Sequence, residues 1–366
     1  MDYRKLPHGT EMISTIGLGL GSIHATSTEE EIEAAVRFAL DNGINFFDLC
    51  CGRVSTFAAV GRAIKPRRDK AYTQMHFGAV YTNDEYGFGR DIDTVKASFE
   101  KVLNASGLGY TDFGYVHCID EDDDYADVMH PGGIFDYIRS LKAQGIVRHI
   151  GCSTHTPSIA RRFIEKGEID MFMFSINPAY DYAECEYGYG EAPERAALYA
   201  LAEQNGVGIS VMKPFAAGQM LDEKRSPLSV ALTREQCIQY ALDRPAVICC
   251  LPGVCGIENV KEVLEFYSST KEQRDYSALG AAIPKDSIGR CVYCNHCAPC
   301  PMGIDIGLVN KYYDLAKMGD DMAKSHYYKL STHADACVQC GHCESRCPFH
   351  VHQIGRMEEI KEYFGE

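Results

Sequence analysis

The chain has 366 residues and a net charge of -15 without any basic run, which argues against a nucleic-acid or anionic-membrane partner. It has no apolar stretch of about 18 residues or more, so we expect no membrane span. Its length favours one large domain plus a small one. The first residues lack the apolar centre of a signal peptide, so we expect a cytoplasmic protein.

Short β-branched or aromatic runs alternate with amphipathic helical segments, the first of which is expected to begin at Thr28 and end at Gly43. No hairpin signal joins two runs, and eight strand–helix units in about 250 residues match an α/β fold, the (β/α)8 TIM barrel. An open doubly wound sheet is the alternative, but "GLGLG" lacks the G-x-G-x-x-G spacing. The predicted strands are residues 14–20, 44–49, 70–76, 112–118, 147–153, 171–177, 207–213 and 246–252.

In such a barrel the chemistry lies at the carboxyl ends of the strands. Asp48 and His117, at the ends of the second and fourth strands, are the pair that core packing explains least. His155 alone is expected to be a structural residue, and the acidic run at 120–124 a solvated loop, because it lacks calcium-loop spacing. The polar and ionisable residues at the strand ends are Asp48, Cys50, Cys51, His76, His117, Ser153, His155, Asn177 and Lys213.

Eight of the 17 cysteines form two tight groups near the C-terminus. "CVQCGHCESRCP" matches the C-x2-C-x2-C-x3-C-P run of bacterial ferredoxins, and "CVYCNHCAPCP" is one residue shorter. Since the fourth cysteine ligates the other cluster in two-cluster proteins, we predict two [4Fe–4S] clusters. Two zinc sites, each with a tetrahedral set of cysteine ligands, are the disfavoured alternative. The predicted ligand sets are Cys291, Cys294, Cys297 with Cys347, and Cys337, Cys340, Cys343 with Cys300.

The other nine cysteines stand mostly beside apolar residues, where a buried thiol behaves as a small hydrophobe. Cys50 and Cys51 are expected mainly to fill space, and a role for either in an active site stays open. The many thiols and the absence of Trp fit an oxygen-poor, anaerobic cytoplasm. These cysteines are Cys50, Cys51, Cys118, Cys152, Cys185, Cys237, Cys249, Cys250 and Cys255.

Five stretches resemble the aldo/keto reductases, in the bacterial branch with a C-terminal ferredoxin-like domain. They are "YRKLPHGTEMISTIGLGLG", "GINFFDLCCGRVSTFAAVGRAI", "GIVRHIGCSTHTPSIARRFI", "GVGISVMKPFAAGQML" and "CNHCAPCPMGIDI". That family reduces carbonyl groups with a nicotinamide cofactor. The resemblance therefore implies an oxidoreductase with a barrel over residues 1–280 and a small, α-rich iron–sulfur domain over residues 281–366.

The resemblance also implies a catalytic group of Asp, Tyr, Lys and His, in which the Tyr protonates the carbonyl oxygen. Asp48 and His117 match two of these positions, but Arg53 replaces the Tyr and His76 replaces the Lys. Arg53 keeps its proton, so it is expected to hold a substrate carboxylate or an oxyanion. His76 is the expected acid, with Asp48 holding its tautomer.

For the nucleotide, Ser153 and Asn177 match positions at which the family grips the nicotinamide amide. Gly218 lies in "PFAAGQML", whose backbone N–H groups are expected to face a pyrophosphate. Gly253 and Asn259 stand where NADP-preferring members carry basic residues. Either NAD(H) binds, or electrons arrive through the clusters.

Two functional hypotheses stay open. The leading one is a redox enzyme for a small carbonyl or activated C=C substrate at the barrel mouth, with electrons passing through the clusters and a ferredoxin or flavoprotein as partner. The alternative is a lyase- or isomerase-type enzyme, or an electron-transfer subunit. The aromatic loops at 77–91 and 179–193 are expected to shape the pocket or dock the iron–sulfur domain, and Tyr81 or Tyr86 is the alternative proton donor.

Overall fold

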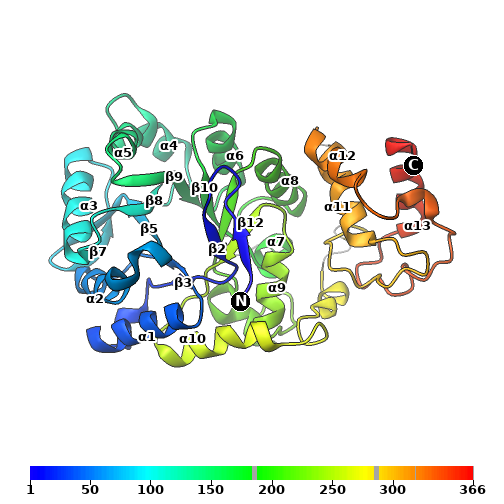
Figure 1. Cartoon of the computed structure of the whole chain (residues 1–366), viewed down its shortest axis with the longest axis horizontal. Coiled ribbons are helices and arrows are strands. Elements are labelled where there is room, and N and C mark those ends of the chain that lie inside the picture. The colour runs from blue at the N-terminus through cyan, green and yellow to red at the C-terminus, as the bar shows by residue number, and fades with distance from the viewer. Residues whose placement is uncertain (184–187, 284–287, 318, 366) are drawn as a thin grey trace.

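The computed structural model describes residues 1–183, 188–283, 288–317 and 319–365. Figure 1 shows a barrel of strands and surrounding helices, coloured blue to yellow, with a smaller helical region in orange and red beside it. Within the described residues, no helix is both long and apolar enough to cross a membrane.

Eight parallel strands form the barrel wall, in the order β12-β11-β10-β9-β8-β5-β4-β3. Bridges from Ile16 to Cys250 and from Gly19 to Gly253 bring the first strand against the last and close the barrel. The TIM-barrel prediction is therefore confirmed. The strands are β3 (Leu18–Gly19), β4 (Phe46–Asp48), β5 (Tyr72–Phe77), β8 (Thr111–Val116), β9 (Val147–Thr154), β10 (Met171–Ser175), β11 (Gly208–Met212) and β12 (Val247–Cys250).

Helices return the chain from the end of one strand to the start of the next. Thr28 and Glu31 form a capping box at the first helix, which confirms the predicted N-cap, and that helix ends two residues before Gly43. The helices of the barrel are α1 (Glu29–Asp41), α2 (Val54–Ile64), α3 (Ile92–Ser106), α4 (Asp122–Met129), α5 (Ile134–Ala143), α6 (Pro157–Lys166), α7 (Pro178–Tyr182), α8 (Ala192–Gln204), α9 (Arg234–Leu242) and α10 (Ile257–Leu264).

An antiparallel hairpin of β1 (Tyr3–Lys5) and β2 (Met12–Ser14) precedes the barrel, so the strand predicted at 14–20 is divided between β2 and β3. Arg4 donates a hydrogen bond of 2.6 Å to the carbonyl of Val247, at the start of β12. The hairpin therefore covers the end of the barrel at which the strands begin.

A second hairpin, of β6 (Ala79–Thr82) and β7 (Glu85–Phe88), was not predicted and lies in the expected loop after β5. Its turn residues Asn83 and Asp84 both have positive φ, the geometry of a type I′ turn. The Asn-Asp pair between alternating apolar residues is the signal that the sequence interpretation passed over. The expectation for Cys185 lies outside the described residues, as does part of the expectation for the loop after β10.

The C-terminal region contains α11 (Ile306–Lys317), α12 (Asp321–Tyr327) and α13 (Gln353–Phe364) around a small hydrophobic core of its own. The cysteine loops also pack on the barrel, because Val292 and Phe349 belong to the main hydrophobic core. The division between residues 280 and 281 stays a prediction.

Two contacts between this region and the barrel lie where helices lead into strands. Arg244, between α9 and β12, donates a hydrogen bond of 2.7 Å to the carbonyl of Val292. Lys311 pairs with Glu203, near the end of α8, over 3.0 Å. Strands begin at this end of the barrel, so the cysteine loops lie away from the mouth at which the strands end.

Candidate active site at the barrel mouth

Three of the predicted catalytic residues meet at the mouth because their strands end there. Asp48 closes β4, His76 is the last residue but one of β5, and His117 follows β8. Asp48 pairs in register with Gln74, so His76 stands two residues further along the same face of β5. All three line a cavity of about 680 Å3, together with Ser153.

Close polar contacts link these side chains into a chain. Nε2 of His76 lies 2.7 Å from Oδ1 of Asp48, and its Nδ1 lies 3.1 Å from Nδ1 of His117. Nε2 of His117 in turn lies 2.6 Å from the hydroxyl of Tyr86. Buried Gln74 also donates to the Asp48 oxygen, over 2.9 Å. Because a carboxylate accepts, we assign the His76 proton to Nε2, and Asp48 thereby selects the tautomer.

Burial decides the protonation state of two side chains at the mouth, His117 and Cys50. It places the pKa of His117 well below its ordinary value, and the neighbouring His76 and Arg90 lower it further. Burial, followed by the Asp48 carboxyl, raises the pKa of the Cys50 thiol well above its ordinary value. His117 is therefore a neutral imidazole and Cys50 a protonated thiol at neutral pH.

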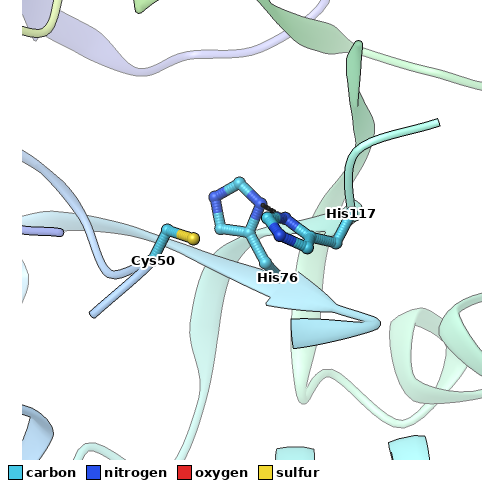
Figure 2. Close-up of side chains that lie close together, drawn as sticks. All are labelled: Cys50, His76 and His117. Carbon is cyan, nitrogen blue, oxygen red and sulfur yellow. Dashed lines mark hydrogen bonds between the residues drawn. The ribbon is translucent and has the colours of Figure 1, made fainter. Parts of the chain in front are cut away.

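The two adjacent cysteines have different surroundings. Cys51 is buried in the barrel core, as expected for a thiol that fills space. Cys50 lines the cavity, and Figure 2 shows its sulfur pointing toward the imidazoles of His76 and His117. One donor atom from each of these three residues lies within 4.8 Å of the others.

The β6–β7 hairpin brings aromatic side chains to His117. Besides Tyr86, Phe88 stacks on the imidazole with ring centroids 5.1 Å apart. Burial raises the pKa of Tyr86 well above its ordinary value, so its hydroxyl holds its proton tightly. Tyr81 is buried and donates its hydroxyl to the carbonyl of Cys51 over 2.8 Å. Of the two tyrosines considered as proton donors, Tyr86 is the one that contacts a predicted catalytic residue.

A second polar group lies at the same mouth; the sequence predicted His155 and Lys213 at the strand ends but not Asp120 or the contacts among the three. Nζ of Lys213 lies 2.9 Å from Nε2 of His155, and Nδ1 of His155 lies 2.9 Å from Oδ2 of Asp120. Burial alone would raise the pKa of Asp120, but hydrogen bonds from His155 outweigh it and lower the pKa to about 2. Asp120 is therefore an ionised, half-buried partner of His155 and not part of a solvated loop.

Arg53 is not brought to the cavity. It is the exposed N-cap residue of α2 and is absent from the lining of the mouth. The basic side chain in that lining is Lys213, which follows β11. The arrangement gives no support to Arg53 as a substrate clamp and puts Lys213 where a substrate carboxylate would be met.

Some of the residues predicted to bind a nucleotide line the cavity, and one does not. Ser153 and Gly218 line the cavity. The N–H of Gly218 donates to the carbonyl of Phe215 within its own loop. Asn177 is buried outside the lining: its side-chain oxygen accepts from the N–H of Tyr180, and its amide donates to the carbonyl of Lys213. Asn177 thus caps α7, and its amide groups have protein partners.

The loop after β12, where a 2′-phosphate is expected in NADP-preferring relatives, has acidic surroundings. A cavity of about 370 Å3 there is lined by Glu31, Glu258 and Asn259, among others. The amide of Asn259 donates to Glu262 over 3.0 Å. A phosphate dianion would meet carboxylates at this position and no basic side chain of the lining.

One predicted set of cluster ligands lines a single small cavity, formed by Cys300, Cys337, Cys340 and Cys343. Gln339, between two of these cysteines, has a positive φ of 55°, and this curls the loop around the thiols. Four converging thiols form a donor set that fits a [4Fe–4S] cluster.

The other predicted set also converges. Burial and the nearby thiols of Cys291, Cys294 and Cys347 all raise the pKa of Cys297. Such mutual destabilisation of thiolates is relieved when iron binds them, so this set fits a cluster as well. In both sets, the ligation itself stays a prediction.

Comparison with known families agrees with this architecture. Residues 15–236, more than half of the chain, match the aldo/keto reductase family. Residues 287–351 match a 4Fe-4S dicluster domain.

Individual relatives are distant. The chain is 24% identical to L-galactose dehydrogenase of Arabidopsis thaliana over 319 residues, which cover 77% of this chain and 94% of that protein. It is 20% identical to the uncharacterized oxidoreductase YqkF of Bacillus subtilis over 294 residues, 72% of this chain and 90% of that protein. The solved aldo-keto reductase AKR11C1 of Bacillus halodurans has a similar fold, with a TM-score of 0.61, 20% identity and coverage of 75% and 94%. The chain therefore belongs to the aldo/keto reductase family, as an oxidoreductase with an added 4Fe-4S dicluster domain.

Proposed function

We propose that this protein reduces a small carbonyl or activated C=C compound bound in the mouth cavity. The observation that carries the proposal is the linked group of Asp48, His76 and His117, which lines that cavity in place of the family's complete catalytic set. Two-electron reduction of a carbonyl puts negative charge on its oxygen. In many enzymes, a group that stabilises such charge in the transition state makes the largest single contribution to the rate enhancement.

Each residue of the mouth has a role that follows from its contacts. Asp48 orients His76, and His76 orients His117, so the His117 imidazole that would face the substrate oxygen is held by residues from the ends of three strands. Lys213, held by His155, adds a positive charge that favours an acidic substrate.

The eight C-terminal cysteines are proposed to hold two [4Fe–4S] clusters, which exchange single electrons when bound. Cys340 is exposed, so a ferredoxin or flavoprotein partner has access to that set of ligands. For a nucleotide, the acidic loop after β12 favours NADH over NADPH, because NADH has no 2′-phosphate to place beside Glu31 and Glu258.

The test is an anaerobic titration with NADH and NADPH separately, with binding followed by fluorescence and cluster reduction by visible absorbance. Micromolar binding of NADH with weaker binding of NADPH, together with reduction of a small carbonyl substrate, is the expected result. If neither nucleotide binds while dithionite still bleaches the clusters, the electrons come from a protein partner. If the protein yields no reduced product with NADH or with reduced ferredoxin, the proposed function fails.

A non-redox reaction of the lyase or isomerase type is the second candidate, and one observation favours it. The cysteine loops contact Arg244, at the start of the last strand, whereas Gly253 beyond its end lines the cavity. At roughly 3.3 Å per extended residue, the stretch from Val247 to Gly253 spans about 20 Å. A product with the same mass as the substrate, formed without electron uptake, would establish this candidate.

A further inference from the structure

The proposed reduction uses His76 and His117 but gives no role to Cys50, whose thiol lies beside them. Cys50, His76 and His117 come from three different elements, and their donor atoms lie within 4.8 Å of one another. The two Nδ1 atoms are 3.1 Å apart. With zinc–nitrogen bonds of about 2.0–2.1 Å, tetrahedral geometry requires a nitrogen–nitrogen distance of about 3.3 Å. The separation of the two imidazoles therefore suits one ion once the rings turn their Nδ1 lone pairs toward it.

The far nitrogen of each imidazole has the partner that a metal-binding histidine needs. Nε2 of His76 faces the Asp48 carboxyl at 2.7 Å, and Nε2 of His117 faces the Tyr86 hydroxyl at 2.6 Å. When each Nε2 donates its proton outward, neither Nδ1 carries a proton, so both Nδ1 atoms are available to bind an ion. Carboxylate or hydroxyl partners of this kind fix the tautomer of metal-binding histidines.

A competing constellation at the mouth is less suited to an ion. Cys118, Asp120 and His155 also lie within 4.8 Å of one another. However, Nδ1 of His155 faces Asp120 and its Nε2 faces the Lys213 ammonium, each at 2.9 Å. An ion at either place displaces one hydrogen bond, but here it would also stand beside the Lys213 ammonium, so the first constellation is favoured.

We propose that Cys50, His76 and His117 bind a divalent zinc-type ion. One thiolate and two imidazoles match the ligand preference of zinc, and three protein ligands with an open fourth position are typical of catalytic sites. The open position faces the mouth cavity, where all three residues are part of the lining. Binding releases the Cys50 thiol proton to solvent and requires the His117 proton on Nε2, where the Tyr86 oxygen accepts it.

The role of the ion, unlike its binding, rests on the proposed function. A positive ion beside the carbonyl oxygen would supply the electrophile that the family takes from its Tyr and Lys. Asp48 would then act as a positioning residue for the ligand His76.

The experiment uses the anaerobic full-length protein with its iron–sulfur clusters intact, so that the C-terminal cysteines do not compete for zinc. Zinc chloride is added, unbound metal is removed by gel filtration, and zinc per chain is measured together with X-ray absorption at the zinc edge, to which iron does not contribute. We expect one zinc per chain with one sulfur and two nitrogen neighbours. Cys50→Ser and His117→Gln should lose this zinc, and the matched control Cys118→Ser should keep it. Asp48→Asn should weaken zinc binding about 10- to 100-fold.

Three results would overturn the inference: no zinc retained at micromolar concentration, a shell of sulfur alone, or loss of zinc in Cys118→Ser but not in Cys50→Ser. If Cys50→Ser does not fold, the zinc content of His117→Gln tests the site instead. Carbonyl reduction by a zinc-free protein would leave the proposed function standing without the metal. Zinc bound as expected, with no reduction of any carbonyl, would leave the metal site standing without the proposed function.

Discussion

The chemistry of the mouth depends on which nitrogen of His76 carries the proton. Its Nε2 faces the Asp48 carboxyl and its Nδ1 faces His117, so removal of the Asp48 charge would free the imidazole to change tautomer. Gln74 donates to the same oxygen of Asp48 and helps to hold the carboxyl in this orientation. A single isosteric substitution therefore tests the whole linked group.

We expect Asp48→Asn to lower kcat/KM for carbonyl reduction by about a hundredfold to ten-thousandfold, which is the rate factor that general acid–base catalysis typically supplies. The amide is the same size as the carboxyl, so the melting temperature should change little. Steady-state kinetics and thermal unfolding check both expectations. Asp69→Asn, which changes an exposed residue, is the control. Wild-type kcat/KM in a folded Asp48→Asn protein would contradict the proposed role.

The preference of the cavity for an acidic substrate is expected to depend on Lys213. Lys213 is the basic side chain in the lining of the cavity, and it is held by His155. We expect Lys213→Gln to raise KM for an acidic carbonyl about 10- to 100-fold, since a hydrogen bond to a charged group contributes about 1.5–3 kcal/mol. A neutral carbonyl of similar size should be affected less. Lys166→Gln, at the end of α6, serves as the control, and an equal loss for both substrates would exclude charge recognition.

At the scale of elements, parallel strands explain which parts of the site the sequence could predict. Because their carboxyl ends meet on one side of the barrel, Asp48, His76 and His117 could be placed at one mouth from the strand pattern, and the family resemblance singled out His76 among the strand-end residues. Tyr86 could not, because its position depends on the β6–β7 hairpin. The pairing of Lys213 with His155 also escaped prediction. It joins side chains from two strands that flank β10, and the sequence pattern does not reveal their rotamers.

The opposite end of the barrel has an ionic contact that makes stability depend on pH. His149 of β9 lies between Glu11, next to β2, and Asp170, next to β10, at 3.0 and 3.5 Å. The contact to Glu11 lacks hydrogen-bond geometry at Nε2, so its attraction is ionic. Burial alone would lower the pKa of His149, but Asp170 and Glu11 outweigh it and raise the pKa above the ordinary 6.5.

A raised pKa in the folded state means that protonation of His149 stabilises the fold. This contribution is complete below about pH 6.5 and is lost as the pH rises through the higher folded-state pKa. We therefore expect the free energy of unfolding to fall as the pH rises above about 6.5, and His149→Gln to make that fall smaller. Denaturant unfolding at several pH values measures it. His130→Gln, directly after α4, is the control, and equal slopes in wild type and His149→Gln would contradict the assignment.

At the scale of the whole molecule, the iron–sulfur region is joined to the barrel by buried contacts. Arg244 is buried and donates to the carbonyl of Val292. Tyr276, whose hydroxyl donates to Asp243 over 2.6 Å, contacts the ring of Phe349 with its own ring edge-on. Phe349, two residues after Cys347, belongs to the barrel core. The cysteine loops thus pack as part of the main fold, and a substitution in the barrel wall beside them should make the clusters less stable.

Gly280 packs directly against the backbone of the second cysteine loop. A Cβ at Gly280 would lie 1.8 Å from the carbonyl oxygen of Pro348, a backbone atom next to the predicted ligand Cys347. Since backbone cannot yield as a side chain does, Gly280→Ala must displace Pro348, at a cost of about 1–3 kcal/mol for overpacking. We expect the visible absorbance of the clusters to bleach faster in the presence of an iron chelator than in wild type. The exposed neighbour Ala281→Ser is the control.

The same variant separates the two candidate functions. If the clusters serve reduction at the mouth, Gly280→Ala should lose ferredoxin-driven turnover in proportion to its lost iron, while the mouth residues, more than the length of a strand away, keep their geometry. If the reaction is a lyase or isomerase reaction, turnover should persist as the iron is lost, because Asp48, His76 and His117 do not contact the cysteine loops. Bleaching at the wild-type rate would mean that the loop moves away from Gly280 without disturbing Cys347, and would contradict the coupling.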